Sequence, residues 1–147
     1  MILHVARLPE LDPRTLYALL RLRVDVFVVE QHCPYPELDG LDLEDKTRHV
    51  WFSPPGDASD PYAYLRLRRE PDADWIGRVC TAPKARGTGL GGRLMSAALG
   101  LATPDVPIRL NAQSHLVDFY TRYGFAPCGP EYVEDDIPHT PMVRAAS

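Results

Sequence analysis

The sequence predicts a mixed α/β (α+β) domain in which helices cover a central sheet. Three observations favour this class: a long amphipathic segment near the N-terminus, several strand-like runs, and a glycine-rich turn between a strand and a helix. The 147 residues, of which 45% are hydrophobic and 24% charged, are typical of one globular core. We therefore expect residues 1–147 to form a single domain that needs neither disulfides nor a structural metal.

The N-terminal part predicts a strand, a helix and a long loop. Residues Ile2 to Arg7 suit a first strand. Asp12 followed by Pro13 is a typical helix start, because aspartate caps the first turn and proline fits the first helical position. Apolar residues at three- and four-residue steps extend this helix to near Glu30. The prolines and the glycine of residues 31–40 exclude further helix and predict a loop.

The rest of the chain alternates strands and helices. Runs 49–52 and 62–68 flank a turn-rich segment, so we expect a β-hairpin. The other predicted strands are 75–81, 108–112 and one near 137–143, and the other predicted helices are 94–101 and 115–123. The glycine-rich segment 82–92 therefore lies directly before the start of a helix.

Charge and composition exclude several classes of partner. Sixteen basic against 20 acidic residues give a net charge of −4, which argues against broad neutralisation of nucleic-acid phosphates. No apolar run approaches the roughly 20 residues of a membrane span, and the first residues lack a secretion-signal pattern. Cys33, Cys80 and Cys128 share no short spacing, so we expect reduced thiols and no metal site. We expect a cytoplasmic protein with neither nucleic-acid nor membrane partners.

Residues Arg86 to Gly92 predict a site for phosphate. The backbone N–H groups at a helix start are unpaired and carry partial positive charge, and glycine lets a ligand approach them closely. Lys84, Arg86 and Arg93 add positive charge around the same turn. The pattern favours a diphosphate ligand. A glycine turn that serves only strand-to-helix geometry stays open as an alternative.

Gly87, Gly89 and Gly92 also fit the dinucleotide pattern G-x-G-x-x-G. That pattern needs an acidic residue about 20 residues later to bind the ribose, and the strand 108–112 contains none. The preceding strands form a predicted hairpin in place of βαβ units. The nicotinamide interpretation is therefore disfavoured.

Two segments carry a family resemblance. Arg86, Gly89 and Gly91 fill the motif Gln/Arg-x-x-Gly-x-Gly/Ala, and residues 119–125 read Phe-Tyr-x-x-x-Gly-Phe. In both segments the chain resembles the GNAT N-acetyltransferase superfamily. Over nearly its whole length it resembles ElaA-like acetyltransferases, through segments 26–35, 39–42, 112–116 and 136–139. Residues 26–31 also resemble autoinducer synthases of the same fold.

The resemblance implies a GNAT fold with a mixed central sheet of about six to seven strands flanked by helices, splayed between the fourth and fifth strands. It implies an N-acetyltransferase that moves acetyl from acetyl-CoA directly to a primary amine of a small molecule, peptide or protein, without a metal. Two alternatives stay open: a non-catalytic acyl-CoA-binding or sensing domain, and an acyltransferase related to autoinducer synthases. A homodimer is also left open.

The same resemblance assigns residues to the cofactor. The strand before the glycine turn supplies backbone to the pantetheine arm, the turn holds the pyrophosphate, and an amide side chain follows on the next strand. The residues assigned are Val79, Cys80, Thr81, Arg86, Gly87, Thr88, Gly89, Leu90, Gly91, Gly92 and Gln113. A backbone N–H near Val79 is expected to polarise the thioester carbonyl.

Proton transfer and acceptor binding receive separate residues. Tyr120 matches the general acid that protonates the departing thiolate. Glu30, Gln31 and His139 are assigned to the acceptor. The general base is left open between Glu30, His49, His115, His139 and a water relay. We expect no catalytic role for Cys33, since nothing near it in sequence activates a thiolate.

Acidic residues gather in two predicted loops. The first holds Glu37, Asp39, Asp42, Glu44 and Asp45, and the second holds Glu131, Glu134, Asp135 and Asp136. If both loops border the acceptor site, we expect them to attract a cationic amine. Two solvated loops are the alternative hypothesis.

Overall fold

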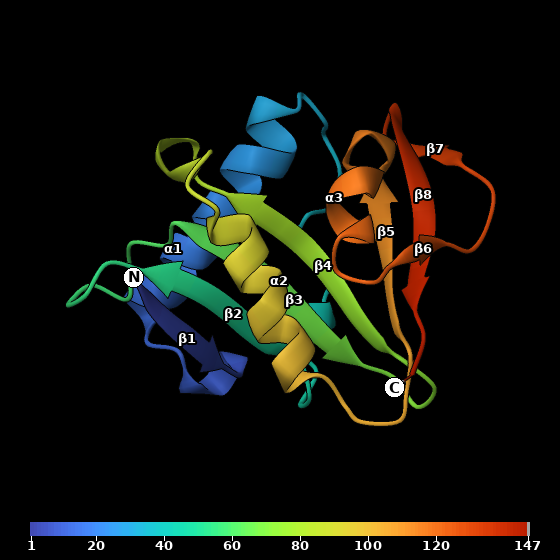
Figure 1. Ribbon diagram of the computed structural model, residues 1–147. Coiled ribbons are helices and arrows are strands. Elements are labelled where there is room, and N and C mark those ends of the chain that lie inside the picture. The colour runs from blue at the N-terminus through green and yellow to red at the C-terminus, as the bar shows by residue number, and fades with distance from the viewer. Residues whose placement is uncertain (147) are drawn as a thin grey trace.

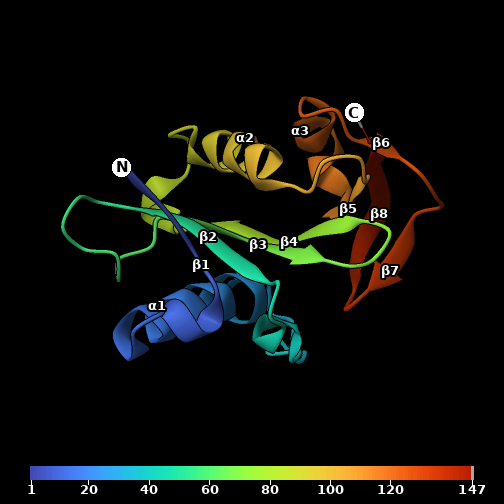
Figure 2. The same ribbon diagram turned by 90° about the horizontal axis from the view of Figure 1, so that it is seen from below.

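A computed structural model describes residues 1–146. These residues form one twisted sheet with helices on both faces (Figure 1). The strands are β1 (Ile2–Ala6), β2 (Arg48–Ser53), β3 (Ala63–Arg69), β4 (Asp74–Thr81), β5 (Ile108–Gln113), β6 (Ala126–Pro127), β7 (Tyr132–Glu134) and β8 (Ile137–Arg144). The α-helices are α1 (Pro13–Val24), α2 (Leu90–Leu101) and α3 (Val117–Thr121). Helix α1 covers one face, and α2 and α3 cover the other (Figure 2).

The strand order is β1-β2-β3-β4-β5-β8-β6, with β7 paired to β8. All neighbouring strands are antiparallel except β4 and β5, which α2 connects in a parallel crossover. The expected hairpin is confirmed, because β2 and β3 pair from Arg48↔Leu67 to Phe52↔Ala63. The expected splay is confirmed as well. The β4–β5 ladder contains only Asp74↔Ile108 and Trp75↔Arg109, and the two strands diverge beyond it (Figure 1).

Helix α1 begins where the sequence predicts. The Asp12 carboxylate accepts a hydrogen bond from the Thr15 backbone N–H at 2.8 Å, and Pro13 is the first helical residue. The regular helix ends at Val24, however, and residues Asp25–Glu30 continue as a π-helix. The apolar spacing does not distinguish these two helical forms. π-Helical turns are rare in proteins, and those that occur are often found at functional sites.

Two apolar clusters fix the helices to the sheet. On one face Leu94 and Met95 of α2 pack against Leu65 of β3. On the other face Leu19 of α1 packs with a smaller cluster that includes Cys80. Burial of such side chains is the main force that holds each helix in place. The sheet is thus covered on both faces, and it is open within its plane where β4 and β5 diverge.

The C-terminal part is more strand-rich than expected. The sequence predicts one last strand, and the structure adds the short strands β6 and β7. The predicted helix 115–123 is a 3₁₀ turn over Ser114–Leu116 followed by α3. Strands of two or three residues are too short to show an alternating pattern. Within residues 1–146, no helix combines the length and apolar character needed to cross a membrane.

Gly92 and Gly100 of α2 give a matched test of how closely Tyr123 packs against that helix. Gly100 has no neighbour within 4 Å of an added Cβ, so we expect Gly100→Ala to raise the free energy of unfolding by about 0.5–1 kcal/mol. A Cβ at Gly92 would meet the Tyr123 hydroxyl, so Gly92→Ala should lower it by roughly 1 kcal/mol. Urea unfolding measures both changes. Stabilisation by both substitutions would contradict the close approach of the Tyr123 hydroxyl to Gly92.

Candidate functional site

A cleft of about 890 Å³ opens where β4 and β5 diverge. Residues 76–81 of β4 line one side of it, and Leu110, Asn111 and Gln113 of β5 line the other. The π-helical segment, the loop that follows it (including Cys33 and Asp39), α3 and the turn between β7 and β8 form the other walls. Beyond Trp75 the edge of β4 that faces β5 has no partner strand. Its backbone groups are therefore available to a ligand that pairs as an added strand.

Most residues predicted for the site lie around this one cleft. Its lining includes Glu30, Gln31, Val79, Cys80, Thr81, Arg86, Gly91, Gln113, Tyr120 and His139. Gly89 and Gly92 border a second hollow, beside Arg93 and Tyr123. Gly87, Thr88 and Leu90 line neither hollow, and Leu90 is only 4% exposed and belongs to the core. Segments far apart in sequence are thus brought together as the sequence predicts.

The glycine turn has the geometry of an anion site. Gly87 and Gly89 adopt φ of 78° and 80°, which L side chains rarely adopt, and Gly89 caps the start of α2. The Thr88 hydroxyl donates to the Ala85 carbonyl and fixes the loop before the helix. The first N–H groups of α2 have no partner within the helix. They can therefore receive phosphate oxygens.

Two residues assigned to different ligands are paired in the structure. Arg86 donates to both carboxylate oxygens of Glu30, at 2.9 Å and 2.7 Å. These hydrogen bonds lower the pKa of Glu30. The pair is roughly half exposed, so it is screened by solvent and opens at small cost. Glu30 thus holds the arginine that the glycine turn would otherwise present to phosphate.

A pair of amides crosses the cleft. Gln31 and Gln113 exchange hydrogen bonds, with N···O distances of 3.4 Å and 3.2 Å. The pair connects the end of the π-helical segment with the end of β5, so these two predicted residues do face the same space.

Tyr120 lines the cleft as a buried, protonated phenol. It is 6% exposed, and burial raises the pKa of its phenol, with a smaller contribution from Cys80. Phe119 and Phe125 pack against its ring edge to face. A buried neutral phenol keeps its proton at physiological pH and can donate it to a developing anion. Tyr123, in contrast, lies at the second hollow.

The candidate bases differ in position. His49 is 1% exposed, its Nδ1 lies 2.7 Å from the Tyr64 hydroxyl, and burial lowers its pKa; it does not line the cleft. His115 and His139 do line it. The His139 Nδ1 lies 2.7 Å from the Ile137 carbonyl, which can only accept, so that nitrogen carries a proton. In the neutral imidazole Nε2 is then the acceptor.

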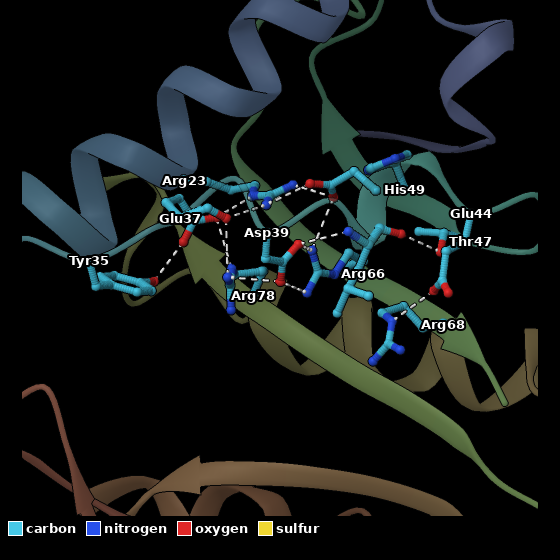
Figure 3. Close-up of polar contacts among 12 residues, drawn as sticks. Arg23, Tyr35, Glu37, Asp39, Glu44, Thr47, His49, Arg66, Arg68 and Arg78 are labelled. Carbon is cyan, nitrogen blue, oxygen red and sulfur yellow. Dashed lines mark hydrogen bonds and ion pairs between the residues drawn. The ribbon is translucent and has the colours of Figure 1, made fainter.

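The first acidic loop does not form an open acidic surface (Figure 3). Glu37 and Asp42 are 4% and 6% exposed, and both accept hydrogen bonds from the fully buried Arg23 at 2.7 Å. Asp39 accepts two bonds from Arg66 at 2.9 Å. The expectation that this loop offers open charges to a cationic amine is wrong for Glu37 and Asp42, which are buried and paired. Asp39 is paired as well, but it lines the cleft. From the second acidic loop, Glu134 and Asp135 do border the cleft.

The sequence interpretation missed the arginines of this network. Arg23 lies on the apolar face of α1 between Leu22 and Val26, and Arg66 lies within a buried strand. An arginine in a run of buried positions is the signal that predicts a paired acidic partner. Arg78 of β4 joins the same network and also lines the cleft.

Asp39 should make the protein sensitive to acid. Burial alone would raise the pKa of Asp39, but hydrogen bonds from Arg66 and the Leu41 N–H bring it to about 2, below the ordinary 3.8. A depressed pKa contributes stability above the unfolded value, and that stability is lost as pH falls from about 4 to about 2. We expect Asp39→Asn to flatten this part of the curve of unfolding free energy against pH.

Urea unfolding at several pH values measures the effect of Asp39→Asn, with Asp45→Asn, an exposed residue of the same segment, as the control. Parallel wild-type and Asp39→Asn curves between pH 4 and pH 2 would contradict the assignment.

Comparisons with known proteins agree with this geometry. Residues 46–146 match the family model described as acetyltransferase (GNAT) domain. A UPF0039 protein of Mycobacterium tuberculosis is 48% identical over 142 residues, which are 94% of this chain and 89% of that protein.

Two solved structures are similar over almost the whole chain. Escherichia coli ElaA superposes with a TM-score of 0.90 at 40% identity, covering 97% of this chain and 98% of that one. An acyl-CoA N-acyltransferase from Pseudomonas aeruginosa superposes with a TM-score of 0.88 at 44% identity, covering 99% and 100% of the two chains.

Proposed function

Because the chain belongs to the GNAT acetyltransferase family, we propose that its cleft binds acetyl-CoA and that acetyl passes directly to a primary amine of a small molecule, peptide or protein. The family makes the protein an acyl-CoA-dependent acetyltransferase. One observation carries the proposal for the cleft: the parallel ladder ends at Trp75, and the cleft beyond it is lined by Arg86 and Gly91 of the glycine-rich segment and by the buried Tyr120. We further propose that residues 1–147 act as one catalytic domain.

The residues present suit the cofactor. The unpaired edge of β4 at Val79, Cys80 and Thr81 offers backbone groups to the amides of the pantetheine arm. The N–H groups of residues 87–92, with Arg86, suit the pyrophosphate. Bound acetyl-CoA supplies an activated acyl group as a thioester. The Cys80 thiol needs no role, because burial raises its pKa to about 12 and keeps it protonated.

The remaining steps move protons. The amine must lose a proton to attack, and the thiolate must gain one to leave. We assign the second step to Tyr120, whose buried hydroxyl borders the cleft. Glu30, Gln31 and His139 line the cleft and stay assigned to the acceptor, although Glu30 pairs with Arg86 in the free protein. The Nε2 of a neutral His139 suits a base acting directly or through water. His49 drops out of the set of candidate bases, since it lies away from the cleft.

Calorimetric titration tests the proposed ligand. The protein is titrated with acetyl-CoA and, in parallel, with NAD, and thiol release is then followed with a panel of primary amines. We expect the protein to bind acetyl-CoA and not NAD, and to release thiol only when an amine is present. Binding of NAD without acetyl-CoA would sink the proposal. Acetyl-CoA binding with no release from any amine class would favour a sensing domain.

Removing the Tyr120 hydroxyl tests the general acid. We expect Tyr120→Phe to lower kcat by about 100-fold or more, since a general acid contributes roughly 10²–10⁴-fold, and to leave the Kd of CoA nearly unchanged. Tyr123→Phe is the matched control, because that hydroxyl lies at the second hollow. Steady-state kinetics and calorimetry measure both quantities. Equal kcat values for the two variants would remove Tyr120 from the mechanism.

Releasing Arg86 tests the phosphate site. Glu30→Gln removes the carboxylate that holds Arg86 in the free protein, and an exposed pair contributes up to about 1 kcal/mol. We expect the Kd of CoA, measured without an acceptor, to fall by up to about fivefold. Glu10→Gln, which breaks the remote exposed pair with Arg7, is the control. Weaker CoA binding by Glu30→Gln would mean that Arg86 does not serve the phosphates.

A further inference from the structure

Strand β4 contains a β-bulge beside the cleft. Its pairing with β3 runs through Tyr64↔Cys80 and then Arg66↔Gly77, so both Arg78 and Val79 lie opposite the single residue between Tyr64 and Arg66. The last β4–β5 pair, at Trp75, lies three residues before the bulge. A bulge adds a residue to one strand and bends it locally. The bulge therefore coincides with the place where β4 leaves β5.

The bulge is held in a conformation that its own residue disfavours. Arg78 has a φ of +55°, in the left-handed region. Glycine usually occupies this position of a bulge, because a Cβ raises the energy of a left-handed backbone. Such a conformation persists only where the surroundings determine it. The source of that constraint should therefore be visible around the Arg78 side chain.

The Arg78 side chain is fixed at several points, as Figure 3 shows. Its Nε donates to Glu37 Oε2 at 2.8 Å, and its Nη2 donates to the Glu37 carbonyl at 3.1 Å and to Asp39 at 3.2 Å. The guanidinium also stacks over Tyr35, 5.7 Å from the ring centroid. Glu37 in the loop therefore holds the Arg78 guanidinium through two acceptors, its side-chain Oε2 and its backbone carbonyl.

Glu37 is itself fixed from the opposite side. Its Oε2 also accepts from Arg23 Nε at 2.7 Å, and its Oε1 accepts from the Tyr35 hydroxyl at 2.6 Å. Arg23 is fully buried in α1, so it ties Glu37 to the helix that covers this face of the sheet. A chain of short charged contacts therefore runs from α1 through Glu37 to the bulge. Charge-assisted bonds of this kind have narrow geometric tolerance.

We propose that Glu37 and Arg78 are positioning residues: the clamp between them fixes the left-handed backbone at Arg78 and so aims the backbone of residues 78–79 at the thioester carbonyl. This inference rests on the proposed acetyl transfer. Arg78 and Val79 both line the cleft, so the clamp acts on groups that face the ligand. Backbone donors stabilise a developing oxyanion only when held in place before the reaction.

The position of the clamp predicts a loss in kcat more than in binding. CoA without an acetyl group lacks the carbonyl that residues 78–79 address, so its Kd should change little. A donor displaced by about 1 Å can lower a rate by roughly 100-fold. We therefore expect Arg78→Ala, which loses the clamp and keeps a Cβ, to lower kcat by about 10- to 100-fold.

Glycine at the same position separates positioning from contact. Glycine adopts the observed φ without a Cβ, so Arg78→Gly keeps the bulge without the clamp. We expect its kcat to exceed that of Arg78→Ala by about tenfold. Arg68→Ala is the matched control, because Arg68 of the neighbouring β3 is held by Glu44 and Glu70 and does not line the cleft. Its kcat should stay near wild type.

The readout combines kcat, the Kd of CoA and a carbonyl signal. Acetyl-CoA carrying ¹³C in its carbonyl is bound without an acceptor, and its NMR shift reports polarisation directly. We expect a downfield shift on wild type, a smaller one on Arg78→Ala, and a largely restored one on Arg78→Gly. Glu37→Gln, which acts on the other end of the clamp, should move the shift as Arg78→Ala does. Circular dichroism checks that each variant folds.

Each result decides the inference. Equal losses in Arg78→Ala and Arg78→Gly would overturn it in favour of a direct guanidinium contact with substrate. A wild-type carbonyl shift and kcat in Arg78→Ala would overturn it while leaving the acetyltransferase intact. Failure of the wild-type protein to bind acetyl-CoA would remove the proposed function itself. If Glu37→Gln does not fold, the comparison of the two Arg78 variants still decides.

Discussion

The parallel pairing of β4 with β5 ends after Trp75, and the arrangement of the whole site depends on that early end. Strand β5 continues with a full ladder to β8, from Ile108↔Arg144 to Gln113↔His139. Beyond Trp75, no strand among residues 1–146 pairs with the edge of β4 that faces β5. Backbone groups inside a protein need hydrogen-bond partners, so the free edge of β4 suits a ligand with amide groups. The cleft is, in physical terms, the space left by missing strand pairing.

Apolar clusters secure both faces of the sheet, and the face under α1 has a buried ionic network in addition. The face under α2 is secured by apolar packing, which tolerates small changes in geometry. Near the end of α1, the buried Arg23 binds Glu37 and Asp42 in the following loop. A buried network of this kind adds little net stability compared with apolar packing, but it strongly disfavours any arrangement that leaves one charge unpaired. It therefore suits a place where backbone position matters for chemistry.

Local signals predicted the framework and the glycine turn of the candidate site. The cap at Asp12, the hairpin of β2 and β3 and the glycine turn before α2 each depend on residues close in sequence. The paired acids could not be read in this way, because their partners come from α1, β3 and β4. In sequence, Glu37 and Asp39 therefore look like members of a solvated loop. Gly77, an isolated glycine within the predicted strand 75–81, is a sequence signal for the bulge that the interpretation did not use. The left-handed residue itself is the neighbouring Arg78, which no local pattern predicts.

If CoA lies along the free edge of β4, it should protect backbone amides of that strand from the solvent. Hydrogen exchange of backbone amides, followed with and without CoA, measures this protection. We predict slower exchange within residues 76–81 of β4 and residues 87–92 of the glycine turn, with no change in β1 at the far edge of the sheet. Unchanged exchange in both of those segments at saturating CoA would contradict the account.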